Sequence, residues 1–198
     1  MAERVTRGSG LLEGFLARRR AAMALRLLDG APRSGGILDV GCGRHPSFLL
    51  RSGFAERFGV DQLVPPHGLE IDGARLLHHA ITPAARLPFE DHRFHAVTML
   101  AVFEHIAPAA LPPLLADTRR VLRHDGLLVI TTPASWTDPI LRTLARLRLV
   151  SGEEIHEHQD AYDHGRIRDH LLQAGFPDDA LRFGSFELGM NLWATARP

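Results

Sequence analysis

Cysteine is nearly absent from this sequence: Cys42 is the only one among 198 residues. One thiol excludes an internal disulfide, and it excludes the zinc sites that several cysteines build. This usage is typical of the reducing cytosol, so we expect a cytoplasmic protein. The histidines and carboxylates form no complete set of zinc ligands at a recognisable spacing, so no residue is assigned to a metal, and the sequence leaves open whether one is used.

An excess of charge of either sign is also lacking. Lysine and arginine together number 23, aspartate and glutamate also number 23, and the pI is about 7.2. Such a balance gives no net field that would attract nucleic acid or an acidic membrane, so we expect neither as a partner. No apolar run reaches membrane-spanning length, and the first residues lack the apolar core of a signal peptide. We therefore expect a soluble, intracellular protein with no integral membrane segment.

No repeat, low-complexity tract or long linker divides the chain, which predicts one domain over residues 1–198. Apolar residues recur at roughly helical spacing from Leu11 to Leu28, so we expect an N-terminal helical extension over residues 1–30. Beyond it, short apolar runs alternate with helical stretches, which requires crossover connections. The sequence therefore predicts an α/β fold with an open, Rossmann-like, mostly parallel sheet that has helices on both faces.

The expected strands are 37–40, 57–60, 76–81, 95–100 and 127–131, the expected helices are 46–51, 113–122 and 164–173, and a turn is expected at 124–126. Two further strands, 181–186 and 190–196, end the chain. Only Glu187 to Gly189 separate them, which is too short for a parallel crossover but suits a hairpin. The sheet should therefore finish with an antiparallel strand.

Two glycines, Gly41 and Gly43, follow the first expected strand and precede a helix. Without a Cβ, they let a ligand approach the backbone, at the strand end where open α/β sheets bind ligands. A dinucleotide fingerprint needs a third glycine where Pro46 stands. The carboxylate of Asp39 would also repel a negatively charged diphosphate. A cationic ligand such as S-adenosylmethionine, which has an ammonium group and a sulfonium, suits Asp39 better. A glycine turn that binds nothing is the alternative.

An acidic residue, Asp61, ends the second expected strand, 22 residues after Asp39. That offset is close to the one at which a carboxylate accepts hydrogen bonds from ribose hydroxyls. Alone, Asp61 would be interpreted as a solvated loop residue. Together with the glycine loop, its position favours a ribose-binding role.

Four segments in this order resemble motifs of the class I S-adenosylmethionine-dependent methyltransferases, in particular the small-molecule group: ILDVGCG at 37–43, LPFEDHRFHAV at 87–97, FEHI at 103–106 and RVLRHDG at 120–126. Residues 166–176, which end in AGF, are similar to the family's late helix. The resemblance implies an enzyme that methylates a small molecule, with oxygen as a candidate acceptor atom. A methyltransferase-like protein that binds the cofactor without catalysis is the alternative. The sequence leaves the oligomeric state open.

The same resemblance implies how the cofactor S-adenosylmethionine is held. Gly41, Cys42 and Gly43 would line its methionine part. Asp39 would hold the ammonium group, directly or through water, and Asp61 would bind the ribose.

Two further positions are assigned to the cofactor by this resemblance. Gln62 directly follows the ribose-binding aspartate. Pro83 stands where the family usually has an acidic residue that accepts from the adenine amino group. A proline side chain cannot accept that bond, so adenine recognition is expected to fall to the backbone of Ala84.

Glu104 and His105 are the candidate catalytic residues, because they follow the fourth expected strand at the ligand-binding edge. Histidine is suited to act as a general base toward a hydroxyl or phenol near neutral pH. A similar pair in the ubiquinone-pathway O-methyltransferases binds a divalent metal together with a glutamate three residues earlier. Ala101 stands at that position here, so one ligand is missing. The alternative is a pair that caps the following helix.

Residues 133–165 are expected to form a substrate-side insertion or lid. Within them, the run from His156 to His164 is dense in donors and acceptors, with His156 and His158 as alternative bases. A solvated polar loop is equally compatible with that run. Residues 139–150 are apolar and studded with arginine, which fits a lid, a dimer surface, a membrane-surface helix or an ordinary core helix.

Overall fold

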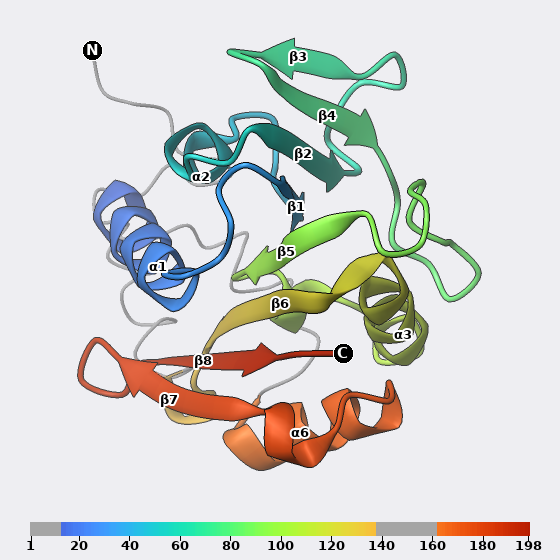
Figure 1. The fold of residues 1–198 in the computed structure, drawn as a ribbon. Helices are drawn as coiled ribbons and strands as arrows, with labels where there is room; N and C mark the ends of the chain where they lie inside the picture. The colour runs from blue at the N-terminus through green and yellow to red at the C-terminus, as the bar shows by residue number, and fades with distance from the viewer. Residues whose placement is uncertain (1–12, 138–161) are drawn as a thin grey trace.

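The computed structural model describes residues 13–137 and 162–198, and Figure 1 shows how their elements are arranged. The helices are α1 (Glu13–Leu27), α2 (Ser47–Arg51), α3 (Leu111–Val121) and α6 (His164–Gln173), with short 3-10 helices η1 (Phe103–His105), η2 (Ser135–Thr137) and η3 (Asp178–Ala180). The strands are β1 (Gly36–Val40), β2 (Glu56–Asp61), β3 (Leu69–Ile71), β4 (Ala74–His78), β5 (Phe94–Leu100), β6 (Leu122–Pro133), β7 (Arg182–Phe186) and β8 (Asn191–Ala196).

The strands form one sheet in the order β3-β4-β2-β1-β5-β6-β8-β7. The five central strands from β4 to β6 run parallel, while β8 is antiparallel to β6 and pairs with β7 in a hairpin. The predicted Rossmann-like sheet with an antiparallel C-terminal strand is therefore confirmed. None of the described helices is long and apolar enough to cross a membrane.

Helices cover both faces of the sheet, as Figure 1 shows, and alternate strand residues serve the two faces. On one face, Ile37 and Val129 pack in a cluster with Ala24 of α1 and Leu49 of α2. On the opposite face, a second cluster of buried apolar residues joins the sheet to α3 and α6. It includes Leu38, Val97 and Leu128 of the sheet, Leu111 and Leu115 of α3, and Ile167 and Leu171 of α6. A sheet buried on both sides explains why its central strands are almost continuously apolar.

The boundaries expected for the third strand were wrong. The strand expected at 76–81 is β4, Ala74–His78, and it is preceded by the short antiparallel strand β3, which was not expected. The turn between them is Asp72-Gly73, where both residues have positive φ (46° and 76°), the geometry of a type I′ hairpin turn. Because the turn reverses the chain there, β4 begins directly after it.

The turn expected at 124–126 lies inside a longer strand. Leu122 pairs with Phe94 and Leu127 pairs with Ala96, so the register shifts and the intervening residues form an irregularity in β6. Gly126 is required at this point, since a Cβ on it would lie 2.9 Å from the Arg123 carbonyl oxygen.

Arg120 connects two of the segments that resemble family motifs, 87–97 and 120–126. Arg120 of α3 donates to the backbone carbonyls of Leu87 (3.2 Å) and Phe89 (2.8 Å) and pairs with Asp91 (2.7 Å). It also pairs with Asp117, which accepts from the Leu87 N–H at 2.6 Å. These bonds fasten the loop before β5 onto α3, and they fix where β5 enters the sheet.

Candidate functional site

The carboxyl ends of β2, β1 and β5 lie side by side at one edge of the sheet. β1 is flanked by β2 on one side and by β5 on the other, and all three run parallel. The strand order therefore reverses direction at β1, which makes its end the topological switch point where ligands bind in open α/β sheets. The loop 41–43 follows β1, Asp61 is the last residue of β2, and the segment 101–105 follows β5.

The glycine loop has a left-handed backbone at both glycines, with φ of +81° at Gly41 and +64° at Gly43. The Gly41 N–H donates to the Val60 carbonyl at 2.8 Å, which joins the loop to β2. A Cβ on Gly41 would lie 2.0 Å from Cγ2 of Val102, the second residue after β5. Gly41 is therefore required by its backbone conformation and by the packing of Val102, a reason that the sequence did not reveal.

Asp61 is buried, with 3% of its surface exposed, and it binds two loops at once. Its Oδ2 accepts from the Gly43 N–H at 2.9 Å, and its Oδ1 accepts from the Leu63 N–H at 2.8 Å. Gln62, between these contacts in the chain, is exposed. The carboxylate thus anchors the glycine loop while it lies at the strand end where the sequence predicted a ribose-binding residue.

Asp39 is a buried carboxyl group on β1, with 5% of its surface exposed. Thr98 of β5, its register partner, donates its hydroxyl to Oδ1 at 2.6 Å. Burial raises the pKa of Asp39 to about 7; the Thr98 hydrogen bond opposes this rise, and the charge of Asp61 adds to it. A buried carboxyl group that is only partly ionised at neutral pH is stabilised in its charged form by a nearby cation.

Cys42 packs into the sheet rather than into solvent. Its side chain is 3% exposed and belongs to the cluster on the α1 and α2 face. It fits there because Gly59 of β2 has no side chain: a Cβ on Gly59 would lie 2.5 Å from the Cys42 Sγ. The backbone of the loop, not this thiol, is therefore the part that faces the strand end.

Glu104 and His105 form the end of η1, directly after β5. Glu104 is buried at 3% exposure, and its Oε2 accepts from the Thr132 hydroxyl of β6 at 3.0 Å. His105 is half-buried, and its backbone N–H donates to the Val102 carbonyl at 3.0 Å. Glu104 thus contacts a neighbouring strand, and this bond differs from the helix cap considered as the alternative.

The other predicted positions lie on the segment after β4 or outside the described residues. Pro83 and Ala84 are exposed in a turn between β4 and β5 that the Ala85 N–H closes by donating to Thr82. The candidate bases His156 and His158 and the segment 139–150 lie outside the described residues. Within the described ranges, no group of three or more His, Cys, Asp or Glu side chains is placed to hold a metal ion.

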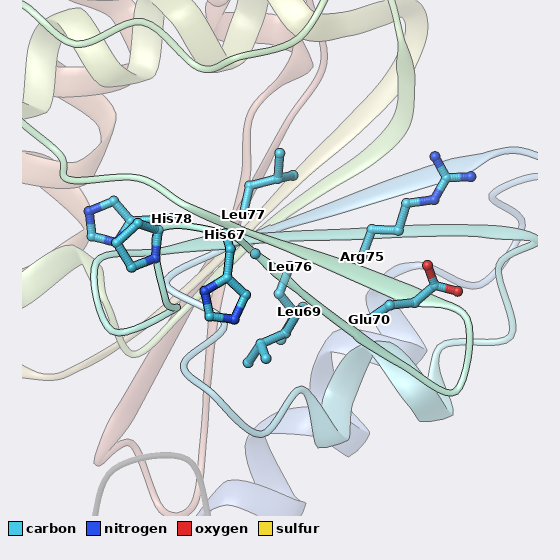
Figure 2. A pocket seen from close by; sticks show the side chains of 9 residues that line it. His67, Leu69, Glu70, Arg75, Leu76, Leu77 and His78 are labelled. Carbon is cyan, nitrogen blue, oxygen red and sulfur yellow. The ribbon is translucent and has the colours of Figure 1, made fainter.

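A cavity of about 410 Å³ lies beside the β3–β4 hairpin, a feature that the sequence analysis missed. In Figure 2, Glu70 and Arg75 lie at one end of it and His67 and His78 at the other. His78 is the register partner of Asp61, so the cavity adjoins the β2 end without including the glycine loop. The Asp72-Gly73 dipeptide was the sequence signal that could have revealed this hairpin.

Comparisons with known proteins agree with this architecture. A protein-family model described as "Methyltransferase domain" matches residues 12–181. No curated protein matches the sequence significantly.

Three solved structures illustrate the likeness. A chain from a complex between the Haloferax volcanii Trm112 methyltransferase activator and a candidate methyltransferase is 16% identical (TM-score 0.67; 93% of this chain and 92% of that chain covered). A TehB-like SAM-dependent methyltransferase from Corynebacterium glutamicum is 21% identical (TM-score 0.55; 93% of this chain and 96% of that chain covered). A SAM-dependent methyltransferase from Archaeoglobus fulgidus is 15% identical (TM-score 0.62; 93% of this chain and 99% of that chain covered). At these identities, the likeness establishes the fold.

Proposed function

Because the chain belongs to this methyltransferase domain family, we propose that it transfers the methyl group of S-adenosylmethionine to an oxygen atom of a small-molecule acceptor. S-adenosylmethionine is the cofactor that the family and the fold imply. When bound, it supplies a methyl group on a positively charged sulfur. The acceptor oxygen would displace the sulfur from this methyl group in line. Positioning contributes much of the acceleration of such a reaction.

The observation that carries the proposal is the buried Asp39 carboxyl group at the switch point of the sheet. Burying a charge is unfavourable unless an opposite charge or hydrogen bonds compensate for it. The ammonium group of the cofactor's methionine part is such an opposite charge. A diphosphate would meet the negative charges of Asp39 and Asp61 instead, and Pro46 interrupts the glycine fingerprint of dinucleotide enzymes. The two carboxyl groups therefore fit S-adenosylmethionine.

Asp61 supports the proposal by a second route. Its carboxylate accepts hydrogen bonds from the N–H groups of Gly43 and Leu63, which hold it at the carboxyl end of β2. An acidic side chain at the end of the second strand is the kind of residue that accepts hydrogen bonds from ribose hydroxyls in such sheets. In this proposal Asp61 binds the ribose and holds the glycine loop, so ribose binding and loop geometry depend on the same side chain.

His105 is the proposed general base. It follows β5 on the edge that holds the glycine loop, and an imidazole there can take a proton from an acceptor hydroxyl as the methyl group is transferred. The neighbouring Glu104 accepts a hydrogen bond from the Thr132 hydroxyl. In this proposal Glu104 has a positioning role and helps to hold the segment that carries His105. Residues 41–43, including Cys42, contribute their backbone to the methionine part.

Calorimetry with S-adenosylhomocysteine tests the cofactor assignment. The wild-type protein should bind it, NAD should not compete, and Gly43→Val should not bind because a branched side chain would occupy ligand space. Gly53→Val is the matched control: Gly53 also has a positive φ (+74°), but its Cβ position is open within 4 Å. Tight NAD binding without any response to S-adenosylhomocysteine would refute the proposal.

A screen of hydroxylated metabolites with labelled S-adenosylmethionine tests the reaction. Transfer of label to an acceptor oxygen is the expected result. Cofactor binding with no transfer to any acceptor would support the alternative, a methyltransferase-like protein that binds the cofactor without catalysis.

A further inference from the structure

We propose that Thr98 is a positioning residue that holds one oxygen of the Asp39 carboxylate, so that the other oxygen faces the ammonium group of the ligand. The inference rests on the proposed function, because it assumes that Asp39 binds that ammonium group. The hydroxyl of Thr98 lies 2.6 Å from Oδ1 of Asp39. Oδ2 accepts no hydrogen bond from the part of the chain that the structure describes.

The surroundings of Thr98 indicate that its hydroxyl is there for this contact. Thr98 is fully buried in β5, and the cluster on its face of the sheet includes Ile37, Ala96 and Val129. A valine would suit a buried strand equally well, whereas a hydroxyl in apolar surroundings is costly unless it forms a hydrogen bond. The Leu38 carbonyl lies farther from this hydroxyl, at 3.4 Å, so the carboxylate is the closer acceptor.

The hydrogen bond also governs when Asp39 is charged. Burial raises the pKa of Asp39 to about 7, and donation from Thr98 opposes that rise because it stabilises the ionised form. Asp61 of β2 is the charged group acting on Asp39 among the described residues. The apolar cluster on this face adds the thiol of Cys42 and uncharged side chains from α1 and α2, among them Leu28 and Leu49. Thr98 therefore keeps the carboxylate available for a cation near neutral pH.

The inference is tested by measuring the affinity of the full-length protein for S-adenosylhomocysteine between pH 5.5 and 9 by calorimetry. Wild-type affinity should rise with pH and level off above about pH 7, the pKa of Asp39. Thr98→Val keeps the shape of the side chain and removes the hydroxyl. Losing a hydrogen bond to a charged group raises the pKa by about one to two units. The midpoint should shift upward by about that amount, and the affinity at pH 7 should fall by about 5- to 50-fold.

Three further variants make the result specific. Thr98→Ser keeps the hydroxyl and should retain the wild-type midpoint. Thr98→Ala removes it without adding a methyl group, and should shift the midpoint as Thr98→Val does, even if valine perturbs folding. Asp39→Asn has no carboxylate and reports the pH dependence that comes from the ligand alone.

The outcomes separate the inference from the proposed function. A wild-type midpoint in folded Thr98→Val and Thr98→Ala would overturn the role of Thr98, as would an affinity loss of equal size at every pH. Failure of the wild-type protein to bind S-adenosylhomocysteine at any pH would instead overturn the proposed function.

Discussion

Replacing Gly41 with alanine should destabilise the protein for two separable reasons. An alanine at φ +81° takes the left-handed conformation that costs a residue with a Cβ about 1–2 kcal/mol. Its Cβ would also lie 2.0 Å from Cγ2 of Val102, and overpacking of this kind costs about 1–3 kcal/mol. The sum, about 2–5 kcal/mol, is a large part of the 5–15 kcal/mol that stabilises a typical protein. For a chain of this length it corresponds to a melting temperature lower by about 4–20 °C.

Two further variants separate the contributions. Gly53→Ala also has a positive φ (+74°), but nothing lies within 4 Å of its Cβ position, so it should show the backbone cost alone, about 1–2 kcal/mol. Val102→Ala removes the two methyl groups that contact the new side chain and leaves its own Cβ 3.0 Å away. In the double variant most of the steric part should be relieved, which predicts a favourable coupling energy of about 1–3 kcal/mol.

The measurement is urea unfolding of the wild type, Gly41→Ala, Val102→Ala, the double variant and Gly53→Ala, followed by fluorescence or circular dichroism. The free energies of unfolding form a double-mutant cycle. Additive losses, within about 0.5 kcal/mol, would refute the steric contact between the loop and the residue after β5. A loss in Gly53→Ala as large as that in Gly41→Ala would assign the whole effect to the backbone.

Three other predictions follow from the same structure. His105→Gln should lower turnover by about 10²- to 10⁴-fold while cofactor affinity and melting temperature stay near wild type; a fall only in step with stability would remove His105 as the base. Burial opposes ionisation of Asp117, but hydrogen bonds from Arg120 and the Leu87 N–H outweigh it and lower its pKa. Its contribution to stability should therefore be present above pH 4 and lost as pH falls further, and Asp117→Asn should flatten urea-unfolding stability in that acidic range. Because the pKa of Asp39 is raised to about 7, ligand-free protein should lose stability as pH rises from about 4 to 7, and Asp39→Asn should remove that loss. An unchanged pH profile in either aspartate variant would contradict the respective assignment.

The sequence predicted those parts of the fold that depend on local pattern. Alternating apolar runs and helical stretches gave the parallel sheet, and the short gap after Phe186 gave the final hairpin. The β3–β4 hairpin was missed because β3 has only three residues, Leu69–Ile71, too few for a period of two to be visible. The Asp72-Gly73 dipeptide, which favours a hairpin turn, was a local sign of it.

The candidate site was predictable in its positions and not in its contacts. Asp39 and Asp61 could be identified because each ends or lies near the end of a strand beside the glycine loop. The partner of Asp39, Thr98, is 59 residues away along the chain, and nothing in the local sequence links them. The same is true of Glu104 and Thr132, 28 residues apart. Such pairs depend on which strands become neighbours, and parallel strands joined by long crossovers have no tight turn between them from which this could be predicted.

The β3–β4 hairpin has a consequence for how the molecules behave toward one another. An unpaired strand at the margin of a sheet exposes backbone N–H and carbonyl groups that can pair with another chain, and proteins limit this hazard by shortening the outermost strand. Here β3 pairs with three residues of β4, which itself has five, and β3 leaves only a three-residue margin exposed. A protein lacking Leu69 to Gly73 would present the full length of β4, and it should aggregate through strand pairing at concentrations where the intact chain stays dispersed.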